Sequence, residues 1–131
     1  MARDRPLAVA EQLRALQRAS PPGTLLVTRA GARWTTLLQP SPFSRVYATR
    51  FVLRPRFIPR VFIEAPALEP RHGPVPHRFG DGSLCLFYGD ECSAARSPAE
   101  TILPWTLEWL FHYEVWLATG RWEGGGIDHH S

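Results

Sequence analysis

Four prolines between residues 65 and 80 strongly limit how this chain can fold. They are Pro66, Pro70, Pro74 and Pro76. Proline lacks a backbone N–H and has a fixed φ, so this stretch is expected to be neither a helix nor a central strand. Long loops in compact domains are usually functional. We therefore expect residues 65–80 to form a stiff loop that leads into a functional segment.

That segment, Pro74 to Tyr88, places a histidine and a cysteine on either side of a turn. Asp81-Gly82 predicts the turn, because glycine accepts a positive φ and aspartate bonds to its own backbone. The turn would bring together His77 and Cys85, which are eight residues apart. The pair suits thiol chemistry, with Cys85 as nucleophile and His77 donating to an oxyanion or favouring the thiolate. Alternatively, Cys85 is a buried strand cysteine and His77 a loop histidine without a role.

A helix and four strands are expected ahead of the proline-rich loop. In residues 6–18 the apolar side chains Val9, Leu13 and Leu16 recur at helical spacing. Four strand-like runs follow, at residues 24–29, 32–38, 45–54 and 58–64. Runs that succeed one another closely usually pair as neighbours. The sequence therefore predicts an N-terminal helix and then a four-stranded antiparallel meander.

A long helix is expected after the loop. Ser97-Pro98-Ala99-Glu100 matches a capping box with proline at the first helical position, which predicts that the helix begins there. Gly120 predicts an end at Thr119, since glycine is preferred just past a helix C-terminus. Pro104 lies inside this span and is expected to kink the helix or to divide it into two pieces.

This helix carries an aromatic stripe at helical spacing. Its members are Trp105, Trp109, Tyr113 and Trp116. We expect the stripe to be core that packs against the sheet, with a ligand platform as the alternative. His112 is expected to be a structural histidine that is hydrogen-bonded near the core. Glu108 and Glu114 are expected to be solvated or ion-paired.

Length and composition set the outer limits. A chain of 131 residues suits one α+β domain over residues 1–131, with a mobile glycine-rich tail at about 123–131. The net charge of +3 comes from 15 arginines and no lysine, and it is spread too evenly for a nucleic-acid-binding surface. The sequence has no apolar run of membrane-spanning length and no signal-peptide pattern. A cytoplasmic protein without a membrane partner is expected.

The second cysteine and the histidines of the tail give weaker evidence for a functional site. Cys92 follows Cys85 by seven residues in a polar stretch, a spacing that matches no common zinc site. We expect Cys92 to be incidental, with a resolving or regulatory thiol as the alternative. His129-His130 beside Asp128 suggest a metal site, but a flexible tail is a poor preformed site. No metal or cofactor is expected.

The order of these features resembles the ubiquitin-conjugating (E2) fold. In that family an N-terminal helix, a four-stranded meander and a long loop with a His-Pro-Asn triplet precede the catalytic cysteine. The cysteine lies in a Gly-x-Ile/Leu-Cys-Leu context, and a helix opening Ser-Pro-Ala follows. The matching segments here are Gly82-Ser83-Leu84-Cys85-Leu86 and Ser97-Pro98-Ala99. The resemblance covers roughly residues 5–119.

The chain departs from the E2 pattern in two ways. In both respects it resembles the bacterial E2-like proteins of CBASS antiphage operons. His77 occupies the position of the triplet's Asn, eight residues before the cysteine, and the chain contains no Asn. The last two helices of eukaryotic E2 enzymes have no room here. The segment of residues 105–122 is also similar to the bacterial proteins.

The resemblance implies a thioester carrier. Cys85 would accept the C-terminus of a ubiquitin-like protein or of a cGAS-like nucleotidyltransferase, supplied by an E1-like enzyme or another activated source, and pass it to an amine on an acceptor protein. His77 would donate to the oxyanion. Three alternatives remain: a cysteine hydrolase that uses Cys85 and His77 as a dyad, a catalytically silent E2-fold binding module, and, as the weakest, arginine-mediated nucleic-acid binding.

Overall fold

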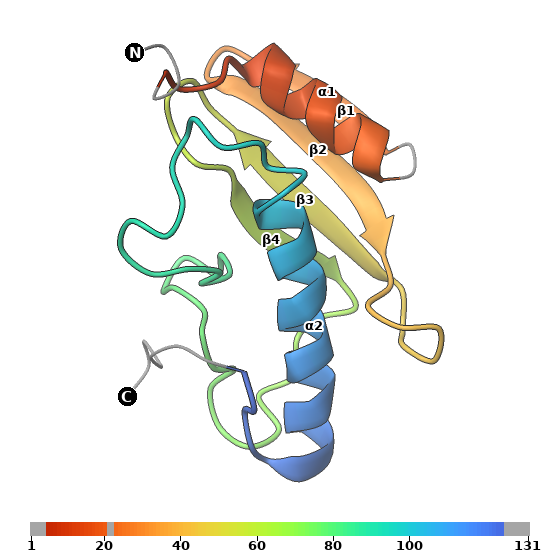
Figure 1. The fold of residues 1–131 in the computed structure, drawn as a ribbon. Helices are drawn as coiled ribbons and strands as arrows, with labels where there is room; N and C mark the ends of the chain where they lie inside the picture. The colour runs from red at the N-terminus through yellow and green to blue at the C-terminus, as the bar shows by residue number, and fades with distance from the viewer. Residues whose placement is uncertain (1–4, 21–22, 125–131) are drawn as a thin grey trace.

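Four antiparallel strands, arranged in sequence order, form the sheet on which the helices pack (Figure 1). This computed structural model describes residues 5–20 and 23–124. The strands are β1 (Thr24–Thr28), β2 (Gly31–Leu38), β3 (Tyr47–Leu53) and β4 (Arg60–Ala65). Helix α1 (Val9–Ala19) precedes the sheet, and α2 (Ile102–Thr119) follows the long loop. The predicted α+β class and the order of elements are confirmed, and the element boundaries shift by a few residues.

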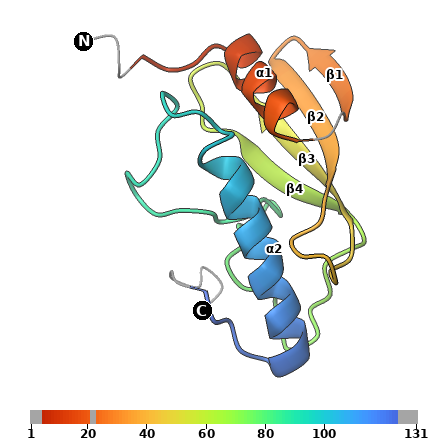
Figure 2. The same cartoon turned by 45° about the vertical axis from the view of Figure 1, so that its right-hand side comes forward.

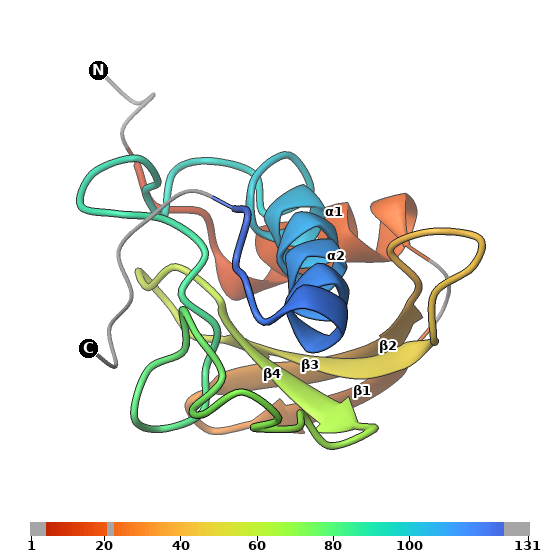
Figure 3. The same cartoon turned by 90° about the horizontal axis from the view of Figure 1, so that it is seen from below.

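Alternating burial along the strands explains why the sheet has a core face. In β3 every second residue is buried, from Tyr47 to Leu53. Phe51 pairs in register with Trp34 of β2, and their ring centroids lie 5.6 Å apart. Seen from below, both helices lie on the same face of the sheet (Figure 3). The buried side chains of β2 and β3 therefore lie on the face that the helices cover, as period-two patterning requires, whereas no residue of β1 is buried.

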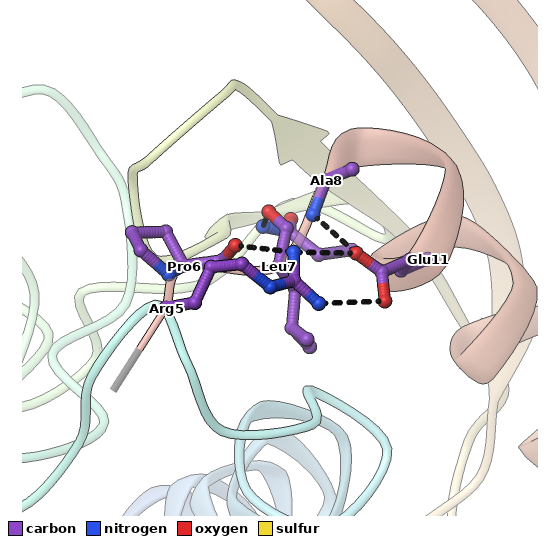
Figure 4. Close-up of polar contacts among 6 residues, drawn as sticks. Arg5, Pro6, Leu7, Ala8 and Glu11 are labelled. Atoms are coloured by element: carbon purple, nitrogen blue, oxygen red, sulfur yellow. Dashed lines mark hydrogen bonds and ion pairs between the residues drawn. The ribbon is translucent and has the colours of Figure 1, made fainter. Parts of the chain in front are cut away.

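The start of α1 is held by its own side chains (Figure 4). The backbone N–H of Ala8 donates to the Glu11 carboxylate at 3.0 Å, and Arg5 pairs with the same carboxylate at 3.2 Å. These contacts hold the pKa of Glu11 below its usual value, first through the hydrogen bond from Arg5. Leu7 then donates its N–H to the carbonyl of Ala94 at 2.8 Å, which ties this end of the chain to the loop before α2.

The predicted start of α2 was wrong. The helix begins at Ile102 after the N-cap Thr101, and residues 98–101 form a turn instead. Pro104 explains the difference, because a helix that began at Ser97 would need an N–H from Pro104 and would press its ring on the carbonyl of Glu100. In the observed helix Pro104 lies in the first turn, where its missing N–H has no helical partner to lose. The helix is consequently one continuous element of 18 residues.

The end of α2 is confirmed, and three of the four stripe residues are buried, whereas Trp105 is half-buried and lines a cavity. Gly120 follows the helix with a φ of +77°, and its N–H donates to the carbonyl of Trp116 at 2.8 Å. Trp109, Tyr113 and Trp116 are only 3–4% exposed. Glu114 is half-buried, and in the described part of the chain its carboxylate accepts hydrogen bonds from three neutral groups: the Ser44 hydroxyl, the backbone N–H of Arg45 and the Tyr47 hydroxyl. It thereby anchors the loop between β2 and β3.

The proline-rich stretch is a loop, as predicted. Between Ala65 and Ile102 only isolated β-bridges occur, and the turned view shows this segment running beside α2 (Figure 2). Within the described part of the chain, neither helix has the length and apolar character that a bilayer crossing would need. The tail beyond residue 124, with the Asp128-His129-His130 motif, lies outside the described residues.

Candidate active site

A tight hairpin sets the spacing of the two candidate catalytic residues. Gly82 has a φ of +93°, and its N–H donates to the carbonyl of Phe79 at 2.9 Å. The Asp81 carboxylate accepts from both the N–H and the hydroxyl of Ser83, at 2.9 and 2.7 Å. Past the turn, the N–H of Cys85 donates to the carbonyl of His77 at 2.9 Å. The turn predicted at Asp81-Gly82 is confirmed, and it makes His77 and Cys85 backbone neighbours.

The hairpin is attached to the edge of the sheet. The N–H of Leu84 donates to the carbonyl of Val61 in β4 at 2.9 Å. Arg60 of the same strand forms an ion pair with Asp81 and a hydrogen bond to the Ser83 hydroxyl. The Ser83 hydrogen bonds, helped by Arg60, hold the pKa of Asp81 below its usual range. The candidate site therefore rests on β4 rather than on a loop alone.

His77 is buried in an unusual backbone conformation. It is 7% exposed and has a φ of +53°, in the left-handed region. Histidine and asparagine are among the residues that adopt this region most often, so His77 can occupy a position where the resemblance expects Asn. Its carbonyl also accepts the indole N–H of Trp109 at 3.0 Å. Two elements thus fix this residue, the hairpin and α2.

Cys85 presents a half-buried thiol with little thiolate character. Its Sγ lies 3.7 Å from the carbonyl oxygen of Phe87. Burial raises the pKa of the Cys85 thiol, and Glu91 raises it further, against a smaller lowering by the contact with Phe87. The net shift does not support the hypothesis that His77 biases Cys85 toward the thiolate.

Cys85 and His77 line the same cavity of about 290 Å³. Its opposite wall is α2, which contributes Trp105, Glu108, Trp109 and His112. These positions follow the i, i+3, i+4, i+7 spacing of a single helix face. The volume is near the lower end of the roughly 300–1,000 Å³ typical of ligand sites. The cavity is therefore large enough for a peptide end or for a small side chain.

His112 differs from its prediction. Its Nδ1 is buried and has no hydrogen-bond partner among the described residues. Its Nε2 lies 3.9 Å from the carboxylate of Glu108, one helical turn away and largely exposed. His112 is thus a wall of the cavity and not a hydrogen-bonded core histidine.

The segment after α2 closes one side of the cavity. The ring of Trp122 lies 5.1 Å from that of His77, 5.3 Å from that of Trp109 and 6.0 Å from that of His112, measured between centroids. Sequence reasoning missed Trp122 and also Glu91, which lies on the loop side of the cavity. For the α2 residues a signal was present, since Trp105, Glu108 and His112 share one helical face.

The second cysteine lies elsewhere. Cys92 is 6% exposed within the core cluster, so it is buried despite its polar sequence neighbours, and it does not line the cavity. Both cysteines are reduced. Among the described residues no group of three or more histidine, cysteine or acidic side chains is placed to hold a metal ion.

The comparison with protein families gives one finding. The model of a family described as E2-CBASS, type II CBASS E2 protein, matches residues 12–130. The comparison with curated proteins finds no match. The family match covers the sheet, the hairpin, the cavity and α2.

Proposed function

Because the chain belongs to the family of type II CBASS E2 proteins, we propose that Cys85 carries the C-terminus of a partner protein as a thioester and delivers it to an amine. Membership of this family implies an E2-like role in antiphage defence. The carried protein would be a ubiquitin-like protein or a cGAS-like nucleotidyltransferase. An E1-like enzyme or an equivalent activated donor would supply the acyl group.

The observation that carries the proposal is the position of Cys85. The thiol lies at the exit of a hairpin fixed to β4, in a cavity large enough for the end of a chain. Its raised pKa supports a carrier role, because a thiol with a higher pKa is a slower leaving group and holds an acyl group longer. Phe87 and Trp105, whose ring centroids are 6.1 Å apart, give the cavity an apolar part.

Loading would proceed by thioester exchange. The sulfur of Cys85, after losing its proton, attacks the carbonyl carbon of the donor thioester, and the donor thiol leaves. The incoming amine then attacks the new thioester, a C–N bond forms, and the Cys85 sulfur departs. His77 would donate to the oxyanion of the tetrahedral intermediate. One such donor is worth about 3 kcal/mol in other acyl-transfer sites.

A loading assay tests this proposal. The protein is incubated with ATP and the products of its neighbouring genes, and the mixture is run on gels with and without reductant. We expect a higher-mass band that disappears with reductant and is absent in Cys85→Ala. Cys92→Ala is the matched control and should load normally. A band that persists in Cys85→Ala and is lost in Cys92→Ala would reverse the site assignment.

One observation favours a second candidate function, that of a cysteine hydrolase. His112 lines the same cavity as Cys85 and could act as a base, and Glu108 is the neighbouring carboxylate that could orient it. The sequence identifies no such third group for a dyad of Cys85 and His77. A hydrolase would release a loaded acyl group to water as fast as to an amine. Comparing the two rates on the loaded protein separates the functions.

A further inference from the structure

His112 has a polar atom that the fold does not satisfy. Its Nδ1 is buried, and none of the described residues offers it a hydrogen bond. Among the described residues, unpaired buried atoms also occur in the core, at Trp34 Nε1 for example, so Nδ1 does not by itself mark a site. The nitrogen that matters for chemistry is Nε2, which lies 3.9 Å from the Glu108 carboxylate. His112 is also the only one of the described α2 residues with an imidazole, the side chain best suited to accept a proton near neutral pH.

The charges around the cavity favour a cation. Glu108 faces it from α2 and Glu91 from the loop after the hairpin. Among the described residues, the other titratable groups that line the cavity are His77, Cys85 and Tyr88. In the described part of the chain no arginine lines this cavity, although the protein has 15. An acidic cavity in a basic protein attracts an ammonium group over an anion.

The gap between Glu108 and His112 fits an amine. The 3.9 Å that separates the carboxylate oxygen from Nε2 is too long for a hydrogen bond between them. A nitrogen placed between the two atoms could lie within about 3 Å of both, which is hydrogen-bond distance. One donor could then bond to the carboxylate and to the imidazole together.

We propose that Glu108 and His112 form the acceptor-amine site, in which the Glu108 carboxylate binds the incoming lysine ammonium and His112 takes its proton. This inference rests on the proposed function of Cys85 as the acyl carrier. It assigns to α2 a catalytic residue that acts only in the transfer step. Loading does not use it.

The step balances without any further reactant. The lysine ammonium gives one proton to Nε2 of His112, the nitrogen next to Glu108, and becomes a neutral amine. Its lone pair forms the C–N bond at the thioester carbon, and the C–S bond breaks with its electron pair moving to the Cys85 sulfur. The amide nitrogen loses a second proton, which the departing thiolate of Cys85 takes up. The imidazolium, stabilised by Glu108, returns its proton to solvent.

The test uses the full chain carrying Cys92→Ala, so that one thiol remains. Cys85 is loaded chemically by exchange with a glycine-ended peptide thioester of 2-mercaptoethanesulfonate, and loading is followed by intact mass. The loaded protein is then discharged with either free lysine or hydroxylamine. Lysine must lose a proton before it attacks, whereas hydroxylamine is already neutral near pH 7.5.

His112→Gln should slow discharge to lysine by roughly 10²-fold, the lower end of what general-base catalysis contributes. Discharge to hydroxylamine should stay within about threefold, because that nucleophile needs little help from a base. Glu108→Gln should raise the lysine concentration that gives the half-maximal rate and leave the loading yield unchanged. Matched controls are His72→Gln and Glu100→Gln, which change the same residue types outside the cavity.

Each outcome supports or overturns the assignment. Equal lysine rates in His112→Gln and in the parent, or equal slowing with both nucleophiles, would overturn it. Slower release to water with no effect on lysine would show that the base serves hydrolysis. Glu108 has an exposed side chain, so its variant remains informative if His112→Gln folds poorly. Failure of Cys85 to load in the parent protein would instead contradict the proposed carrier function.

Discussion

The two faces of α2 differ in how completely their polar atoms are paired. On the face toward the sheet, the Tyr113 hydroxyl accepts the N–H of Glu69 at 2.8 Å, and the Thr106 hydroxyl donates to the carbonyl of Ile102 at 2.6 Å. On the face toward the cavity, Glu108 is exposed and the Nδ1 of His112 lacks a partner among the described residues. The contrast holds within α2 only, because Trp34 Nε1 and Gln12 Oε1 in the core also lack partners among the described residues.

Trp109 belongs to both faces. It is 4% exposed, it stacks on Tyr113 with centroids 5.7 Å apart, and its indole N–H donates to His77. The helix therefore supports the sheet and fixes the loop of the candidate active site through one side chain. Substitutions on the sheet face of α2 should lower stability, and substitutions on its cavity face should affect activity.

Loss of Trp109 should have the largest effect. Trp109→Ala removes a buried indole and leaves the carbonyl of His77 one donor short, so unfolding should become easier by about 3–5 kcal/mol. That is a large share of the roughly 5–15 kcal/mol by which a domain is stable. Thermal and urea melts measure it. If Trp109→Ala melted like the wild type but failed to bind its partner, the aromatic stripe would be an exposed docking surface and not part of the core.

Loss of the His77 side chain should affect transfer more than loading. His77→Ala keeps the backbone carbonyl that Cys85 and Trp109 bind, so the fold and the thioester should survive. Discharge to an amine should slow by about 10²–10³-fold if His77 is a single oxyanion donor. Single-turnover discharge of the loaded protein measures this rate. Equal discharge rates in the wild type and in His77→Ala would exclude His77 from the transfer step. If His77→Ala failed to load while remaining folded, the role of His77 would be to tune the pKa of the Cys85 thiol.

The thiol on the cavity side should respond strongly to pH. Since burial and Glu91 raise the pKa of Cys85, the thiol is mostly protonated at pH 7–8.5 and its thiolate fraction rises about tenfold per pH unit. Alkylation by iodoacetamide in a Cys92→Ala background should follow that slope without a plateau. Glu91→Gln should react faster at each pH, because it removes a charge that raises the pKa. A plateau below pH 8 would contradict the raised pKa.

Local sequence signals predicted the order of helices and strands and two of the residues that line the candidate site, His77 and Cys85. Apolar periodicity placed the helices and strands, and Asp81-Gly82 placed His77 beside Cys85. The start of α2 could not be read from Ser97-Pro98-Ala99-Glu100 alone, because Pro104 excludes a helix that includes Glu100. The capping motif covers four residues, whereas the clash involves Pro104, one turn further along the chain.

The rest of the site depends on tertiary packing. Glu91, His112 and Trp122 reach Cys85 from segments 6 to 37 residues further along the chain. The spacing of the α2 residues showed that they share a face. It did not show whether that face meets the sheet or the loop, because that depends on how the helix is rotated against its neighbours.

The smallest expected effect concerns the hairpin that joins the cavity to the sheet. Asp81→Asn keeps an oxygen that can accept from Ser83 but removes the ion pair with Arg60. The pair is exposed, so its loss should cost only about 0.2–1 kcal/mol. The folded pKa of Asp81 is lowered, so its contribution is present above the unfolded pKa of about 4 and is lost as the pH falls through the folded value. Wild type and Asp81→Asn should therefore differ in melting temperature at pH 7 and converge as the pH falls below about 4. A constant difference over that range would show that the Asp81 charge does not stabilise the hairpin, and that the backbone bond from Leu84 to Val61 is sufficient to attach it to β4.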